Sequence, residues 1–257
     1  MATGFGVRHE WDRLREAIVF DDEVLDDGEL CRTLEREGVI VRRQPAIAPR
    51  DPLIVIGPHL IEASLRGPER QAERFALRPL VQQVAQRRGV QWTSVPPGWA
   101  NAVDGPWLEG GDVVLNGSEI YVGMSGRASD MAGIDWLERL LGPDYRVIPM
   151  AMRSSVKHLE DVLALVRPGL LVCCPALLID GLPTALRSWD AIVLSPGEAE
   201  AHAAHFLGLD ERRAIIEASN GRVDEELRRR DITTLPLVSP RGLRTAYHPL
   251  WRERVAV

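Results

Sequence analysis

Cysteine is scarce in this sequence. Only three of the 257 residues are cysteines, at Cys31, Cys173 and Cys174, and two of them are adjacent. Three cysteines cannot build a disulfide framework, and neighbouring cysteines do not easily bridge each other. We therefore expect a protein that works in a reducing compartment.

Long apolar runs and an excess of basic residues are also missing. No stretch approaches the ~20 apolar residues that span a bilayer, and the N-terminal residues 1–15 lack the basic segment and apolar core of a secretory signal. Lys and Arg number 31 against 37 Asp and Glu, for a formal net charge of −6, and the basic residues are mixed with acidic ones. These absences argue against a membrane or nucleic-acid partner and favour a cytoplasmic location.

What is present fits an ordinary folded α/β protein. Hydrophobic residues make up 45% of the chain and charged residues 26%, so a sizeable core can be buried. Short β-branched segments, such as 53–56 and 170–174, alternate with helical patterns, such as 70–88 and 129–141. The pattern predicts an α/β fold, and without a Pro- or Ser-rich linker we expect residues 1–257 to form a single domain.

One structural unit recurs along the chain. Residues 112–115 and 118–122 are apolar runs joined at Asn116-Gly117, which predicts a hairpin with a tight turn. A helix and a strand near Arg146 follow, giving strand, strand, helix, strand. A similar unit starts at 159–166 and continues at 170–174, and a weaker copy spans 209–237. Such repetition favours a pseudo-symmetric ring over a doubly wound sheet.

Three short segments carry the residues best suited to chemistry. Arg50-Asp51-Pro52 and the Gly-Gly pair before Asp112 each place a carboxylate at the start of an expected strand. Lys157-His158-Leu159-Glu160 opens another, where His158 and Glu160 would share one face and suit proton transfer. Each segment alone also fits a structural turn or cap.

Together these segments resemble a known family, the glycine amidinotransferases and related guanidine-modifying enzymes. The matching phrases run colinearly through most of the chain: His9-Glu10-Trp11-Asp12, Pro49-Arg50-Asp51, Ile61-Glu62-Ala63, Leu108 to Asp112, Gly133-Ile134-Asp135-Trp136, Gly142 to Val147, and His158-Leu159-Glu160. The resemblance implies a five-bladed pseudo-symmetric α/β propeller, the pentein fold.

The resemblance also implies roles for individual residues. Family members form a covalent amidino intermediate on a cysteine, with a histidine as general acid and base and carboxylates holding the cationic guanidinium. Asp51 and Asp112 would be the guanidinium carboxylates and His158 the acid/base. Glu160 stands where the family usually has aspartate. Paired carboxylates suit a planar cation because they accept several of its hydrogen bonds.

Two departures from the family pattern concern the nucleophile and the substrate clamp. The position of the family cysteine falls on Thr245, whose hydroxyl needs a strongly positioned base to act as a nucleophile. Leu177 replaces the arginine that grips the substrate carboxylate, a loss that an apolar side chain cannot repair. Arg244 and His248 flank Thr245 and either contact substrate or end a strand in solvent.

Other candidate groups receive structural interpretations. Cys173 and Cys174 are expected to be buried small hydrophobes rather than replacement thiols. His202 and His205, three residues apart on an expected helix, are interpreted as surface histidines rather than zinc ligands. The sequence holds no nucleotide-binding or metal-binding motif, so we expect neither a cofactor nor a metal.

Three hypotheses for function follow. The first is a diverged amidinotransferase-family enzyme that acts on a guanidino or amine-bearing small molecule in biosynthesis, without a cysteine intermediate. The second is a non-catalytic pseudoenzyme that binds a cationic ligand or a partner. The third is an arginine:amine amidinotransferase with an atypical nucleophile. The sequence leaves homo-oligomer formation open.

Overall fold

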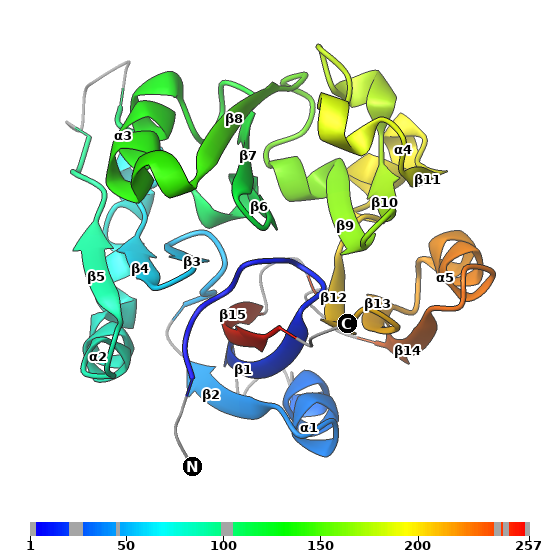
Figure 1. Cartoon of the computed structure of the whole chain (residues 1–257), viewed down its shortest axis with the longest axis horizontal. Helices are drawn as coiled ribbons and strands as arrows, with labels where there is room; N and C mark the ends of the chain where they lie inside the picture. Colours follow the sequence, from blue (N-terminus) through cyan, green and yellow to red (C-terminus); the bar gives the residue numbers. More distant parts are fainter. Residues whose placement is uncertain are drawn as a thin grey trace.

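The computed structural model describes residues 4–20, 28–44, 47–98, 105–238, 243 and 247–254. Five three-stranded sheets follow one another around the molecule, with the helices on the outside (Figure 1). The strands are β1 (Arg13–Phe20), β2 (Ile40–Gln44), β3 (Leu53–Ile56), β4 (His59–Glu62), β5 (Gln91–Ser94), β6 (Val113–Asn116), β7 (Glu119–Met124), β8 (Arg146–Ala151), β9 (Leu163–Arg167), β10 (Leu170–Cys173), β11 (Asp190–Val193), β12 (Phe206–Asp210), β13 (Arg213–Glu217), β14 (Thr233–Leu237) and β15 (Tyr247–Glu253).

Helical segments connect these strands. The α-helices are α1 (Gly28–Arg36), α2 (Glu73–Ala85), α3 (Met131–Leu141), α4 (Pro196–Glu200) and α5 (Gly221–Arg228). The 3₁₀ helices are η1 (Pro68–Arg70), η2 (Gly110–Asp112), η3 (Gly142–Asp144), η4 (Leu159–Asp161), η5 (Pro175–Leu177) and η6 (Thr184–Leu186). None of the described helices is both long and apolar enough to cross a membrane.

Each sheet has the same internal pattern. Its central strand pairs antiparallel with one neighbour and parallel with the other, as β7 does with β6 and β8. Two parallel neighbouring strands need a crossover connection between them. In four sheets this connection contains an α-helix, and between β10 and β11 it contains the 3₁₀ helices η5 and η6. The predicted five-bladed α/β propeller is therefore confirmed.

The first sheet joins the two ends of the described chain. Its central strand, β1, pairs parallel with β2 and antiparallel with β15, and Arg13 lies opposite Glu253. The antiparallel strand of this blade therefore comes from the C-terminal part of the chain. This pairing closes the ring of sheets.

Several local predictions agree with the structure. The hairpin is present as β6 and β7, although the pairing extends to Asn116 and Glu119, so Gly117-Ser118 forms the turn. Gly117 has a φ of 69°, which a primed turn requires and glycine adopts without strain. Helix α3 stops before Gly142, which also has a positive φ, as the Gly-Pro signal predicted.

The predicted strand at 159–166 was wrong in its first half. Leu159–Asp161 form η4, and β9 begins only at Leu163. The Asp161 carboxylate accepts a hydrogen bond from the backbone N–H of His158 at 3.0 Å, which caps this turn. Side-chain capping of this kind competes with extended structure, and the apolar pattern does not record it.

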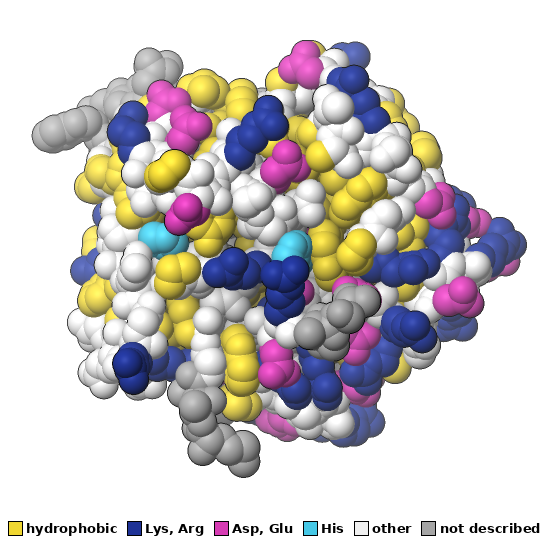
Figure 2. Space-filling view, viewed as in Figure 1, with side chains coloured by type: hydrophobic (Ala, Val, Ile, Leu, Met, Phe, Trp, Pro, Cys, Tyr) yellow, Lys and Arg dark blue, Asp and Glu magenta, His cyan; other side chains and the backbone are white. Residues whose placement is uncertain are grey.

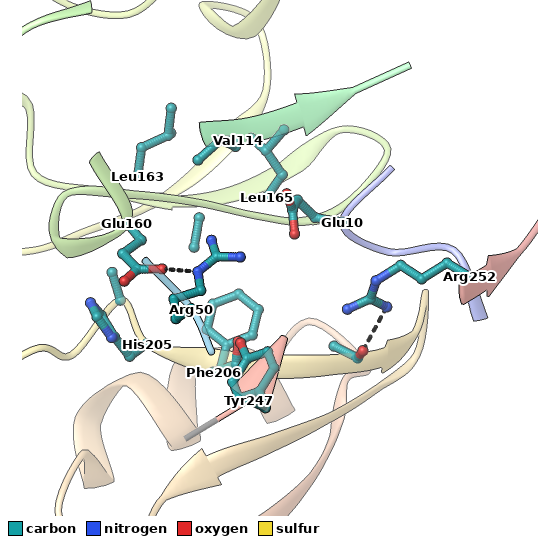
Figure 3. Close-up of a pocket in the computed structure, with 13 residues that line it drawn as sticks. Glu10, Arg50, Val114, Glu160, Leu163, Leu165, His205, Phe206, Tyr247 and Arg252 are labelled. Carbon is teal, nitrogen blue, oxygen red and sulfur yellow. Dashed lines mark hydrogen bonds and ion pairs between the residues drawn. The ribbon is translucent and has the colours of Figure 1, made fainter. Parts of the chain in front are cut away.

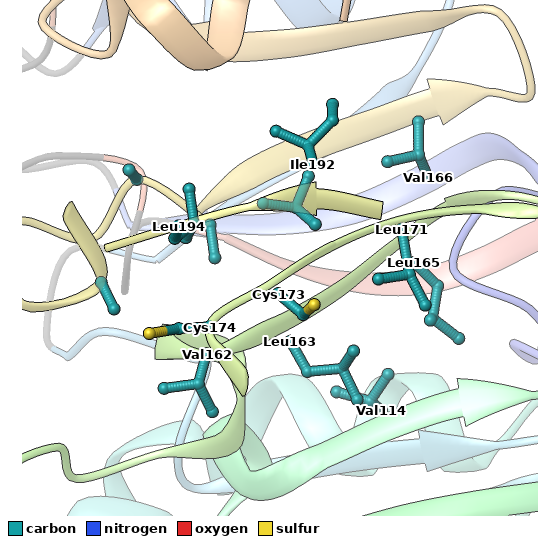
Figure 4. Packing of buried hydrophobic residues seen from close by; sticks show 14 of the residues in the cluster. Val114, Val162, Leu163, Leu165, Val166, Leu171, Cys173, Cys174, Ile192 and Leu194 are labelled. Carbon is teal, nitrogen blue, oxygen red and sulfur yellow. The ribbon is translucent and has the colours of Figure 1, made fainter. Parts of the chain in front are cut away.

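Buried apolar side chains fill the space within and between the blades. The largest cluster gathers around β9, β10 and β11 and includes Leu163, Val172 and Ile192 (Figure 4). Cys173 and Cys174 are fully buried in it, as expected. Close packing of this kind holds the blades in register and fixes the turns at which the polar residues meet.

Candidate active site

Glu109 and His158 form the centre of the candidate site. Glu109 directly precedes η2 and His158 directly precedes η4, and both side chains are almost completely buried. His158 Nε2 lies 2.9 Å from Glu109 Oε2 and 3.7 Å from Asp51 Oδ1. A histidine and a hydrogen-bonded carboxylate form a pair able to hold and transfer a proton.

The glycines between Glu109 and Asp112 allow this close approach. A Cβ on Gly111 would lie 2.8 Å from His158 Nδ1 and 2.9 Å from Asp51 Oδ1. A Cβ on Gly110 would lie 2.1 Å from the Arg50 carbonyl oxygen. Since real Cβ contacts are longer, side chains at both positions would push the site apart.

The charges of the pair stabilise each other. Burial alone would lower the pKa of His158, but the Asp51 charge and the Glu109 hydrogen bond raise it to about 9. Burial opposes ionisation of Glu109, but His158 and Lys157 lower its pKa to about 2. An imidazolium beside a carboxylate is therefore the favoured state at neutral pH.

Two further cations contact these carboxylates. Lys157, the only lysine in the sequence, lies with Nζ 2.8 Å from Glu109 Oε2. Arg70 bridges Glu109 Oε2 and Asp51 Oδ2, each at 2.9 Å, and also pairs with Glu73. These cations hold the carboxylates in fixed orientations.

Asp112 was predicted to bind a guanidinium group, but in the structure its carboxylate contacts backbone N–H groups instead. Its Oδ2 accepts from the Ser129 backbone N–H and its Oδ1 from the Leu159 backbone N–H, both at 3.0 Å. The side chain is fully buried, and burial raises its pKa to about 7. Asp112 therefore ties segments of the site together, and Glu109 is the carboxylate that contacts His158.

The role of Glu109 was missed in the sequence. It lies in the same segment as Asp112. Because a strand was expected to start at Asp112, only this later carboxylate was predicted to belong to the site. The η2 turn places Glu109 against His158 instead. The signal was the Glu-Gly-Gly-Asp sequence itself, with two acids flanking the glycines on which the close packing depends.

Two buried carboxylate oxygens beside His158 have no hydrogen-bond donor among the described residues. They are Asp51 Oδ1 and Glu160 Oε1. The other oxygen of Asp51 pairs with Arg70, and the other oxygen of Glu160 accepts from Arg50 Nε at 2.5 Å. An acceptor oxygen from each carboxylate and a ring nitrogen of His158 lie within 4.8 Å of one another. A buried acceptor without a protein donor is a place where a water molecule or a ligand can donate a hydrogen bond.

A central pocket adjoins this group. Figure 3 shows Arg50 and Glu160 paired on one side and Glu10, Phe206, Tyr247 and Arg252 around them. Burial raises the pKa of Tyr247 to about 12, so its hydroxyl stays protonated at neutral pH. The pocket thus offers charged groups of both signs and one neutral hydroxyl. Figure 2 shows that basic and acidic side chains also lie near one another on one face of the molecule.

His248 lines a neighbouring cavity together with Glu10, Arg50 and Gly110. Neither of its ring nitrogens has a partner in the described part of the chain. Burial and the Arg50 charge hold the pKa of His248 well below its usual value, so its ring is neutral. Arg244 and Thr245, the other predicted site residues of this segment, lie outside the described residues.

Two other sequence features have clear positions. Leu177 is buried in the largest apolar cluster, as suits an apolar replacement of the expected arginine. Neither His202 nor His205 lies on a helix as predicted, and the interpretation as a surface residue was wrong for His205, whereas His202 is partly exposed. Helix α4 ends at Glu200, His205 is buried, and both rings hydrogen-bond to Asp161. Both rings contact the same oxygen of the buried Asp161 carboxylate, Oδ1.

The chain is similar in sequence to known amidinotransferases. No family model matches the chain. The chain is 29% identical to an L-arginine:L-lysine amidinotransferase of Pseudomonas savastanoi pv. phaseolicola over 74% of its length and 66% of the relative. It is 24% identical to the mitochondrial glycine amidinotransferase of Xenopus laevis over 80% of its length and 62% of the relative. The chain thus spans less than two thirds of these relatives.

Solved structures show the same fold. An amidinotransferase of the saxitoxin biosynthetic pathway from Microseira wollei superposes with a TM-score of 0.84 at 22% identity, covering 98% of both chains. The inosamine-phosphate amidinotransferase of Streptomyces griseus gives a TM-score of 0.82 at 20% identity, covering 96% of this chain and 97% of that one.

Proposed function

Because this chain is a glycine amidinotransferase-like member of the pentein superfamily, we propose that it is a diverged enzyme of that group. In this proposal it acts on a guanidino or amine-bearing small molecule in biosynthesis, without a cysteine intermediate. His158 transfers protons, and Asp51 and Glu160 bind the cationic group of the substrate.

The oxygens of Asp51 and Glu160 that accept no hydrogen bond from the described residues carry the proposal. Both are buried acceptors without a donor among the described residues, and both belong to carboxylates whose other oxygen is fixed by an arginine. A guanidinium or ammonium group supplies N–H donors and positive charge together. Filling these acceptors would remove a desolvation cost that the free protein bears.

His158 suits the role of proton donor. Its raised pKa makes the ring an imidazolium at neutral pH, and Glu109 holds Nε2 while Nδ1 has no partner in the described residues. A protonated ring can donate to a leaving amine and then act as a base. In the proposal Nδ1 carries this exchange and Glu109 orients the ring.

The cysteines support chemistry without a thiolate. Cys31, Cys173 and Cys174 are all buried in apolar clusters, and burial raises the pKa of Cys173 to about 11. A neutral buried thiol is a poor nucleophile. Thr245 is proposed as a hydrogen-bonding hydroxyl or, as a secondary role, the nucleophile, with Arg244 and His248 as substrate contacts.

A second candidate is a binding protein without catalysis. The observation that favours it is the number of cations already at the site, since Arg50, Arg70 and Lys157 each pair with one of the carboxylates. In that case the pocket holds a cationic ligand or a partner and performs no reaction. An arginine:amine amidinotransferase with an atypical nucleophile is the third candidate.

Product analysis and intact-protein mass spectrometry separate these candidates. The purified protein is incubated with arginine, other guanidino compounds and amine acceptors, and products are identified by mass. We expect a product without a covalent amidino adduct, and a loss of turnover of about 100-fold to 10,000-fold in His158→Ala. Thr245→Cys is the matched comparator, in which an adduct would show that residue 245 faces the substrate.

Each result has a distinct meaning. An amidino adduct on Thr245 of the native protein would make Thr245 the nucleophile, and an adduct on any other residue would contradict the proposal and favour the third candidate. Ligand binding without any product would favour the binding protein. Turnover that survives His158→Ala unchanged would exclude His158 as the proton-transfer group.

A further inference from the structure

A second cluster of polar side chains lies next to the turn that carries His158, and one member, His205, also lines the central pocket (Figure 3). It consists of Asp161 at the end of η4 and of His202 and His205, which lie between α4 and β12. Asp161 and His205 are 3% and 5% exposed, whereas His202 is 37% exposed. The cluster therefore has a buried base and one side open to solvent.

The three side chains converge on one carboxylate oxygen. Asp161 Oδ1 lies 2.9 Å from His202 Nδ1 and 3.0 Å from His205 Nε2. Asp161 Oδ2 accepts from the His158 backbone N–H at 3.0 Å, which fixes the direction of Oδ1. One donor atom from each residue lies within 4.8 Å of the others.

This set of donors matches the preferences of a transition metal. Imidazole nitrogens and a carboxylate oxygen bind Zn²⁺ at about 2.0–2.2 Å, and catalytic zinc sites commonly use three protein ligands and one open position. Two ligand atoms at that distance from the ion in a tetrahedral site lie about 3.3 Å from each other. Small side-chain movements from the observed separations of 2.9 and 3.0 Å would therefore bring the three ligand atoms into place. The exposed edge of His202 leaves room for a fourth ligand from solvent.

The hydrogen bonds to Asp161 further favour a preformed site. They hold both imidazoles with a nitrogen directed at the carboxylate, so little side-chain ordering remains to be done when an ion binds. Neutral imidazoles with one carboxylate carry a single negative charge, which a divalent cation compensates.

We propose that Asp161, His202 and His205 bind a divalent transition metal ion, for which Zn²⁺ is the best chemical match. The ion would replace the hydrogen bonds that now join the three side chains. Because Asp161 also caps the His158 turn, the bound ion would fix the position of that turn. Asp161 would then be both a ligand and a positioning residue for His158.

Metal titration of the whole chain tests the proposal. Chelator-treated protein is titrated with Zn²⁺ by calorimetry and with Co²⁺ by visible absorption, which reports the ligand geometry directly. We expect one site, absorption bands of a four-coordinate Co²⁺ complex, and a metal-dependent rise in the thermal midpoint. His202→Ala, at the exposed ligand, should bind at least about tenfold more weakly, and so should His205→Ala.

His9→Ala is the matched control. His9 also pairs with an aspartate, with Nδ1 3.1 Å from Asp12 Oδ2, but within the described residues it belongs to no group of three or more such side chains. This variant should bind metal as the native protein does. Absence of Zn²⁺ and Co²⁺ binding by the native protein at millimolar concentration would overturn the proposal, because the cluster would then be held by hydrogen bonds alone. Unchanged affinity in both His202→Ala and His205→Ala would also overturn it.

Discussion

Glu16 and the Asp51–Glu160 pair are buried carboxylates that differ in how completely they are satisfied. Glu16, on β1, is fully buried, and both of its oxygens accept from arginine: Oε2 from Arg87 Nη1 at 2.7 Å, and Oε1 from Arg87 Nη2 at 2.7 Å and from Arg42. Asp51 and Glu160 each keep one oxygen without a donor in the described residues. Burial and ion pairing are thus common to both regions, and only the unsatisfied acceptors distinguish the candidate site.

Glu62 follows the complete pattern. It is fully buried at the end of β4, and its oxygens accept from Arg78 and from the Ser94 hydroxyl. This carboxylate closes a structural contact between elements. Glu16 and Glu62 are therefore buried carboxylates whose oxygens all accept hydrogen bonds from the protein itself, whereas Asp51 and Glu160 each keep one oxygen that does not.

The largest stability effect is expected from Glu16→Gln. The substitution leaves the charges of Arg42 and Arg87 without their carboxylate, and breaking a buried pair costs about 3–5 kcal/mol. Because Arg42 is 30% exposed, we expect about 3 kcal/mol, the lower end of that range. Chemical denaturation measures the loss, while ligand binding by the folded fraction should stay unchanged. A large change in ligand binding would mean that Glu16 is not purely structural and that the two regions do not differ in function.

Asp51→Asn should show the opposite pattern. It removes one of the carboxylates that pair with Arg70, but Glu73 and Glu109 still pair with that arginine, so we expect a smaller loss of unfolding free energy than in Glu16→Gln. Binding of a guanidino ligand should weaken about tenfold, which corresponds to about 1.4 kcal/mol. Calorimetric titration beside denaturation checks both quantities. A loss of stability as large as in Glu16→Gln, with binding intact, would make Asp51 a structural residue.

The pH dependence of stability should separate the regions further. Burial alone would raise the pKa of Glu16, but the hydrogen bonds from Arg87 and Arg42 hold it below its usual value of 4.5. Its stabilising contribution is therefore complete above about pH 4.5 and is lost as the pH falls through the lowered folded pKa. Denaturation from pH 7 to pH 3 should show a steeper loss in the native protein than in Glu16→Gln. Parallel curves would contradict the assigned role of Glu16.

Arg229→Ala should have the smallest effect. Arg229, directly after α5, forms an ion pair with Glu225 on α5, and both side chains are 61% exposed. Exposed pairs contribute little because water and salt screen them, so we expect no measurable shift of the denaturation midpoint. A clear shift of the denaturation midpoint would mean that the exposure of an ion pair does not predict whether the pair stabilises this chain.

The repeating architecture could be predicted from the sequence because its signals are local. The apolar runs around Asn116-Gly117 and the Gly142-Pro143 stop both specify their structure through nearby residues. The conformation at His158 could not be predicted, because the Asp161 cap overrides the extended pattern. The choice of Glu109 over Asp112 and the burial of His205 likewise depend on contacts between distant segments.

The pairing of β1 with β15 constrains when the molecule can finish folding. Arg13 meets Glu253, so the first blade lacks its antiparallel strand until almost the whole described sequence has left the ribosome. The later blades draw their strands from neighbouring segments and can form during synthesis. Strand β1 is thus among the last of the described strands to gain both of its neighbours. Until β15 pairs with it, the open edge of β1 is available for incorrect pairing with other chains.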